Sequence, residues 1–295
     1  MSTVNQKHHS ANVAVPAMIG AAALIAMTSI IGKSLGAEGS IGDALHPLQV
    51  SAGRFAFAAM TLGFFLLAVP SSRPNFKGTN WSLHLMRSLC GWSGVTAMFA
   101  AVAKMPVAEA TAISFLSPVV TMGLAAFLLK EHVGIRKVLA SFLALLGAIL
   151  ILRPGTEAFQ VAGLFALLAA ALMGLEAIFI KRLTGNEPAM RILIINNIMG
   201  SAIAVTVAVF VWTHPTYLQW VLLVALGVVM VSGQSLFIQS MKSGEASLVM
   251  PAFYFVLVFA GLYDLALFSV FPNVVAFVGA AMIILSAVLL SRMRT

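Results

Sequence analysis

The stretch AEATAISFLSPVVTMGLAAFLLKEHVG, residues 108–134, reads as a membrane helix with a proline inside it. Residues 244–273, GEASLVMPAFYFVLVFAGLYDLALFSVFPN, follow the same plan: Glu-Ala, an early proline, and an apolar run that ends in a polar turn. A proline inside a helix removes one backbone hydrogen bond and frees a carbonyl. In lipid, that carbonyl must face protein or a water-filled cavity. Pro118 and Pro251 therefore predict two broken helices, which either border a cavity or only aid packing.

The composition places most of the protein surface in lipid. Of the 295 residues, 61% are hydrophobic and 9% are charged, whereas a soluble domain has about 25% charged residues. A chain with so few charges cannot cover its own surface with polar groups. We therefore expect an all-α integral membrane protein.

The apolar runs predict ten membrane-spanning helices. Most of these runs approach the roughly 20 residues that cross a hydrocarbon core, and none shows the alternation of a β-barrel strand. The first run is long and lacks a convincing cleavage site, so we interpret it as a retained helix. The runs lie at about 14–32, 46–69, 83–103, 107–129, 135–152, 158–180, 190–212, 218–240, 246–268 and 274–290.

The basic residues predict that both termini face the cytoplasm. With the N-terminus inside, twelve of the 17 basic residues fall in inner segments, against three in outer segments (Lys33, Lys104 and Arg153). Cytoplasmic loops of membrane proteins carry this excess of Lys and Arg. The net charge of +8 is then accounted for without a nucleic-acid partner, since anionic lipid attracts such segments. We expect a multi-pass protein of a bacterial inner membrane.

The two opening segments also predict an internal repeat. They are spans four and nine, and because five spans separate them, the copies cross the membrane in opposite directions. Inverted repeats are typical of secondary transporters, whose substrate site lies near the membrane midplane. We predict a tail at 1–13, a first five-helix repeat at 14–153, a second at 158–291 and a tail at 292–295.

The chain resembles the EamA domain of the drug/metabolite transporter superfamily. The resemblance rests on the 108–134 stretch, on ILRPG at 151–155 and on the Pro-x-x-Tyr pattern that begins at Pro251. It covers essentially the whole chain and is close to the YddG-type amino-acid exporters. It implies an inverted-repeat fold that exports solutes by alternating access. One departure is Ser269-Val270, where the family often places Gly-Glu, so the partner of Glu131 in a symmetric pair of glutamates is absent.

Ionisable side chains inside spans are costly and are functional candidates by default. Arg54 and Asp264 fall in the outer halves of spans two and nine, and Arg87 and Glu176 near the inner ends of spans three and six. By depth, Arg54 can meet Asp264, and Arg87 can meet Glu176. These pairs either hold the structure together or form and break as gates that couple transport.

Neutral polar residues supply candidates for substrate binding. A primary amide at the bilayer centre needs a partner, so we expect Gln234 and either Asn196 or Asn197 to face a cavity; adjacent helix positions point about 100° apart. Flat side chains with a polar handle suit an amino acid or an organic cation. Hydroxyls either bind substrate or only aid helix contacts. The candidates of these last two kinds are Trp92, Tyr254, Ser117 and Thr28.

The sequence lacks the motifs of catalytic, metal-binding and ATP-hydrolysing sites. The chain has one cysteine and shows no HExxH zinc motif, no Walker A motif and no GxSxG nucleophile motif, so we expect no cofactor, no metal and no enzyme. The sequence predicts a transporter whose partners are lipid and a small-molecule substrate, first of all aromatic or neutral amino acids exported from the cytoplasm. Proton-coupled efflux of cationic drugs and passive movement of small metabolites remain alternatives, and the oligomeric state is open.

Overall fold

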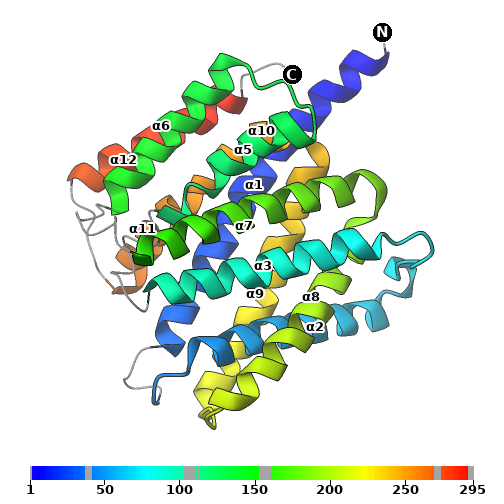
Figure 1. Cartoon of the computed structure of the whole chain (residues 1–295), viewed down its shortest axis with the longest axis vertical. Coiled ribbons are helices and arrows are strands. Elements are labelled where there is room, and N and C mark those ends of the chain that lie inside the picture. Colours follow the sequence, from blue (N-terminus) through cyan, green and yellow to red (C-terminus); the bar gives the residue numbers. More distant parts are fainter. Residues whose placement is uncertain are drawn as a thin grey trace.

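The computed structural model describes residues 2–36, 42–102, 111, 113–152, 161–268 and 274–291, which form helices joined by short turns (Figure 1). The α-helices of this part are α1 (Ser2–Leu35), α2 (Pro47–Ala68), α3 (Trp81–Val102), α5 (Ser117–Leu128), α6 (Ile135–Leu152), α7 (Val161–Asn186), α8 (Ala189–Ala208), α9 (Tyr217–Ser243), α10 (Ala246–Val249), α11 (Phe255–Phe268) and α12 (Val274–Ser291). Short 3-10 helices lie at Pro70–Ser72 (η1), Val209–Val211 (η3) and Met250–Tyr254 (η4).

The helices follow the predicted spans. Six segments of the described chain are long and apolar enough to cross a membrane, and shorter apolar helices lie at Ser117–Leu128 and Phe277–Leu290. Together, α10, η4 and α11 occupy the ninth predicted span. We call the end of the bundle where α1 begins the near end, and the end where α1 finishes the far end. The start of α1 and the end of α12 both lie in the upper part of the view in Figure 1.

The structure has a helix interruption at each of the two prolines where the sequence predicts one. Pro118 stands in the first turn of α5, directly after a short turn. Pro251 lies in η4, which separates α10 from α11. The two interruptions contact each other, because the Tyr254 hydroxyl donates a 2.6 Å hydrogen bond to the Phe115 carbonyl and the two rings stack 5.6 Å apart. A backbone acceptor at the first interruption is thus satisfied by a side chain from the second.

The long helices pack in pairs. α1 lies along α9, α3 lies along α7, and α2 contacts both α8 and α9. α5 packs on α7, and α1 also contacts α11. α3 and α7 run side by side across the middle of Figure 1, so a side chain of α7 can reach α3 in the interior.

α6 and α12 form a pair of their own at one edge of the molecule (Figure 1). The sequence places small residues along α6, and Ala140, Ala144 and Ala148 are all buried there. The Ser286 hydroxyl of α12 donates a 2.7 Å hydrogen bond to the Ala140 carbonyl. Gly147 and Gly279 oppose each other so closely that a Cβ added to either glycine would lie 2.5 Å from the carbonyl oxygen of the other. Such close approach of small residues is typical of helix contacts in membranes.

This crossing predicts a stability effect. Gly147→Ala forces a methyl group against backbone, which cannot move as a flexible side chain can, so we expect unfolding to become easier by about 1–3 kcal/mol. Gly63→Ala is the matched control, because a Cβ at Gly63 meets nothing within 4 Å. Thermal unfolding of the purified variants in detergent measures the difference. Equal midpoints for the two variants would contradict the close crossing.

Candidate transport site

A small cavity of about 130 Å³ lies in the interior between α3, α5, α7, α9 and η4. We call it the central cavity. Its polar lining consists of Arg87, Ser117, Glu176 and Gln234. Its apolar lining includes Met173, Met230, Met250, Phe237 and Phe253. A polar group of a ligand and an apolar side chain of the same ligand would therefore both find partners here.

Arg87 and Glu176 form the charged pair of this cavity. The Arg87 Nε lies 3.8 Å from the Glu176 Oε1, and the Arg87 side chain is almost fully buried. Arg87 also donates a 3.2 Å hydrogen bond to the Ile192 carbonyl, which fixes the guanidinium between α3 and α8. Glu176 lies within the electrostatic reach of a second cation, Arg54. An ionised carboxylate inside a membrane protein requires such compensation.

A glycine makes room for this carboxylate. A Cβ added to Gly91 on α3 would lie 3.0 Å from both Cδ and Oε1 of Glu176. That distance is shorter than almost any ordinary contact of a Cβ atom. The GWSG stretch of α3 therefore lets the Glu176 side chain lie directly against the helix backbone, next to Arg87.

Gln234 and Asn197 join α9 to α8 beside the cavity. The Asn197 Nδ2 donates to the Gln234 Oε1 at 3.0 Å and to the Leu193 carbonyl at 2.9 Å. Gln234 also lines the cavity, and because its oxygen already accepts a hydrogen bond, its amide NH₂ is the group that can donate to an acceptor such as a carboxylate. The Asn197 Oδ1 is buried without a hydrogen-bond partner among the described residues. Asn196 is buried and does not line the cavity.

A larger cavity of about 470 Å³ lies at the far end, between the end of α1, the start of α2 and the neighbouring parts of α3 and α9. We call it the far cavity. Arg54 lines it together with the hydroxyl-bearing Thr28, Ser29 and Ser51. The Thr28 hydroxyl donates to the Ile25 carbonyl of its own helix at 2.7 Å. Thr28 and Arg54 therefore share a cavity, which is separate from that of Gln234 and Glu176.

The structure leaves other candidates away from these cavities. Tyr254 is fully buried, and its hydroxyl is occupied by the Phe115 carbonyl. Trp92 does not line either the central or the far cavity. The side chain of Asp264 lies outside the described part of the structure, so its pairing with Arg54 stays a prediction.

A network at the near end holds the start of α10. The Glu131 carboxylate accepts 2.9 Å hydrogen bonds from the backbone N–H groups of both Ala246 and Ser247, the first residues of α10. Lys137 pairs with Glu245, and Lys181 donates to the Gly244 carbonyl. We call these contacts the near-end latch. Backbone N–H groups at a helix start carry partial positive charge, so a carboxylate is favoured there.

A second near-end cluster fixes the turn between α7 and α8. Glu187 accepts a 2.8 Å hydrogen bond from the Asn80 backbone N–H, and its other oxygen lies 3.0 Å from the His84 Nε2 and 3.6 Å from Arg191. Burial alone would raise the pKa of the Glu187 carboxyl, but the hydrogen bonds from Asn80 and His84 and the charge of Arg191 bring that pKa below its ordinary value. The cluster ties the start of α3 to the loop before α8.

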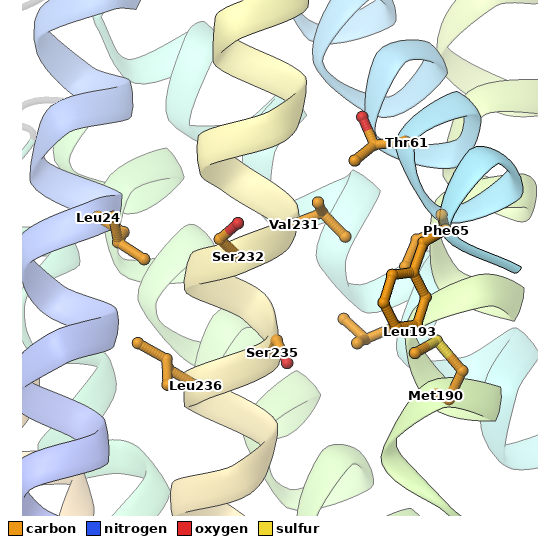
Figure 2. Close-up of a pocket in the computed structure, with 10 residues that line it drawn as sticks. Leu24, Thr61, Phe65, Met190, Leu193, Val231, Ser232, Ser235 and Leu236 are labelled. Carbon is orange, nitrogen blue, oxygen red and sulfur yellow. The ribbon is translucent and has the colours of Figure 1, made fainter. Parts of the chain in front are cut away.

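A third cavity, of about 460 Å³, is largely apolar and lies beside α9. Figure 2 shows Ser232 and Ser235 of α9 between Leu24 of α1 on one side and Thr61 and Phe65 of α2 on the other. Several of its side chains are exposed on the described surface, including Phe65 at 42%. In a bilayer, this surface would face lipid tails.

Sequence reasoning missed several of these residues. Glu131 was singled out only through the family pattern, and its contact with α10 crosses more than a hundred residues of sequence. Gly91 gave no signal of its own, because only the folded helix pair places it against Glu176. Lys137 lies in the first turn of α6 and Glu187 in the turn between α7 and α8, and the spacing of the sequence does not indicate a partner for either residue.

The model of the EamA-like transporter family matches residues 12–153 and again residues 160–292. The chain belongs to the EamA-like transporter family. An S-adenosylmethionine uptake transporter of Rickettsia bellii is 27% identical over 83% of both chains. A pseudopaline exporter of Pseudomonas aeruginosa is 24% identical over 70% of this chain and 74% of its own length. A riboflavin transporter of Vibrio cholerae is 23% identical over 90% of this chain and 89% of its own length.

A solved crystal structure of a protein with 20% sequence identity superimposes with a TM-score of 0.78. The superposition covers 94% of this chain and 96% of that chain. The fold is therefore shared along nearly the whole length.

The contact between Gly91 and Glu176 predicts an activity effect. Gly91→Ala pushes the carboxylate away from α3 by a few tenths of an ångström, and a displacement of about 1 Å can reduce the rate of a positioned reaction by about a hundredfold. We therefore expect substrate exchange in proteoliposomes to fall by roughly threefold to tenfold. Gly123→Ala is the control, because a Cβ at Gly123 meets nothing within 4 Å. If both variants exchanged substrate at the same rate, transport would not depend on the position of the Glu176 carboxylate, and the prediction would be wrong.

The Glu187 cluster predicts a pH dependence of stability. A carboxyl with a lowered folded pKa stabilises the fold at pH values above its unfolded pKa and loses that effect as the pH falls through the folded pKa. We expect wild type to exceed Glu187→Gln in unfolding free energy at neutral pH. The difference should shrink as the pH falls below about 4.5, the ordinary value for glutamate. Unfolding in detergent between pH 7 and pH 3 measures it, and a difference that grows toward low pH would contradict this assignment.

Proposed function

We propose that the protein is a secondary transporter that exports small zwitterionic solutes, amino acids first, by alternating access. The observation that carries the proposal is the central cavity, where a carboxylate, a guanidinium and a primary amide share the lining with apolar side chains. A zwitterion can place its ammonium on Glu176 and its carboxylate on the NH₂ of Gln234. Phe237, Phe253 and the methionines then accept an apolar side chain.

The relatives support a polar organic cargo. Their names give S-adenosylmethionine, pseudopaline and riboflavin as cargo, and both uptake and export occur among them. S-adenosylmethionine is a methionine that bears an adenosyl group, so an amino-acid headgroup is already a cargo feature in this family. Export from the cytoplasm follows from the resemblance to amino-acid exporters.

The distribution of cavities supports alternating access. At the near end, the latch ties α10 to α5 through Glu131 and to α6 through Lys137. At the far end, the larger cavity lies between the helix ends. We interpret this arrangement as a state closed at the cytoplasmic near end, with two inverted repeats, 14–153 and 158–291, that rock between this state and its opposite.

Efflux of organic cations is the second candidate, since Glu176 offers a buried carboxylate to a cation. Two guanidinium groups lie close to this carboxylate, however, and they repel a cargo that carries only positive charge. A zwitterion satisfies both signs, which is why it ranks first.

Exchange in proteoliposomes tests the proposal. Vesicles preloaded with unlabelled amino acids should take up radiolabelled L-phenylalanine or L-leucine without a pH gradient. Gln234→Ala should abolish most of this exchange, because it removes the donor in the cavity and the bond to Asn197. Ser232→Ala is a matched control on the same helix, since its hydroxyl donates only to the Val228 carbonyl one turn earlier.

The outcomes separate the candidates. Amino-acid exchange that fails in Gln234→Ala and persists in Ser232→Ala supports the zwitterion carrier. Exchange of organic cations without any amino-acid exchange would instead favour the drug exporter. Uptake that shows no acceleration by internal substrate would favour a passive facilitator.

A further inference from the structure

Arg54 differs from the other buried cation of the interior in having no ionic or hydrogen-bonded partner in contact among the described side chains. Its Nε, like that of Arg87, is buried without a hydrogen bond to any described residue. The guanidinium carbon lies 4.3 Å from the centroid of the Phe55 ring. Arg87, by contrast, pairs with Glu176 and donates to a backbone carbonyl. A guanidinium inside a membrane bundle that has no direct partner among the described side chains is costly unless something binds it.

The position of Arg54 is built into the packing. Phe55 packs against α8 at Gly200, where an added Cβ would lie 2.5 Å from the ring. The Phe55 ring stacks on the guanidinium, and Arg54 lines the far cavity. Thr28, Ser29 and Ser51 line the same cavity and supply hydroxyls. A rigid fork of N–H donors with hydroxyls nearby matches the geometry of a carboxylate.

The charges of the interior favour the same ligand. Arg54 and Arg87 are two positive groups that face one negative group, Glu176, among the described side chains. One further negative charge would balance them. The far cavity, at about 470 Å³, has room for a ligand of the size of an aromatic amino acid.

We propose that the far cavity is a carboxylate-binding site in which the Arg54 guanidinium holds the carboxylate of the transported solute. This proposal rests on the proposed function and narrows its cargo to solutes that carry a carboxylate. It replaces a gating role for Arg54 with a binding role. In the export cycle, the site is the last that the cargo occupies before it leaves at the far end.

A binding experiment tests the site without any transport step. The probes are 3-phenylpropionate, phenethylamine and L-phenylalanine, which share a phenyl ring and differ in their charged groups. Ligand-dependent thermal shifts of the full-length protein in detergent give each affinity. We expect wild type to bind 3-phenylpropionate and L-phenylalanine, and to bind phenethylamine at least tenfold more weakly.

Variants of Arg54 locate the binding. Arg54→Gln should weaken 3-phenylpropionate binding by about tenfold or more, as expected for loss of a charged hydrogen bond. Arg54→Lys keeps the charge and loses the fork, so it should fall in between. If Arg54→Gln does not fold, 3-phenylpropionate binding can still be measured in Arg54→Lys and in Phe55→Leu. Phe55→Leu removes the ring that orients the guanidinium and keeps an apolar side chain against α8.

Three results would overturn the proposal. The first is phenethylamine binding as tight as that of 3-phenylpropionate. The second is unchanged 3-phenylpropionate binding in every folded Arg54 variant. The third is 3-phenylpropionate binding that appears only, or becomes at least tenfold tighter, in Asp264→Asn, which would show that Asp264 occupies Arg54 in the wild type.

The experiments distinguish a failure of the proposed transport function from a failure of the proposed Arg54 site. Binding of 3-phenylpropionate through Arg54 without exchange of any amino acid would retain the site and reject amino-acid transport. Amino-acid exchange with 3-phenylpropionate binding that ignores Arg54 would retain transport and reject the site.

Discussion

The partly buried Glu176 carboxylate inside the helix bundle is the constraint on which the centre of this structure depends. A charge at that depth requires a counter-charge and close protein contacts. Arg87 supplies the first across the α3–α7 pair, and Gly91 supplies the room. The bond from Arg87 to the Ile192 carbonyl then extends the same constraint to α8. Arg87 and Gly91 on α3 and Ile192 on α8 therefore hold the Glu176 side chain of α7 in place.

The two interrupted helices also depend on specific side-chain contacts. Each interruption exposes backbone groups that lipid cannot satisfy. The Tyr254 hydroxyl satisfies a carbonyl at the first interruption, and Glu131 binds the backbone N–H groups that open α10. Glu131 comes from the polar end of the 108–134 stretch, and α10 lies in the 244–273 stretch. The two similar segments therefore contact each other twice, once in the interior and once at the near end.

The sequence predicted the spans, the positions of the interruptions and the ionisable residues of the interior, because hydropathy, proline and charge act locally. The sequence could not show which helices and side chains contact one another. The small residues of α6 give the helix a smooth face, but only the structure shows that α12 crosses this face, at Gly147. Tyr254 had the composition of a binding residue, yet its hydroxyl is occupied by a backbone carbonyl from a distant helix. Asn196 and Asn197 are indistinguishable in sequence, and only the position of Gln234 selects Asn197.

The central claim, that the two ends open in turn, is tested most directly by thiol accessibility. Cys90 is the one native cysteine, so a Cys90→Ala background can carry Ser51→Cys in the far cavity or Ile180→Cys in the central cavity. A membrane-impermeant thiol reagent is applied from each side, with and without Glu131→Gln to weaken the latch. The account predicts that Glu131→Gln raises the reactivity of Ile180→Cys from the cytoplasm and lowers that of Ser51→Cys from outside. A simultaneous rise at both positions would indicate a continuous pore and contradict it.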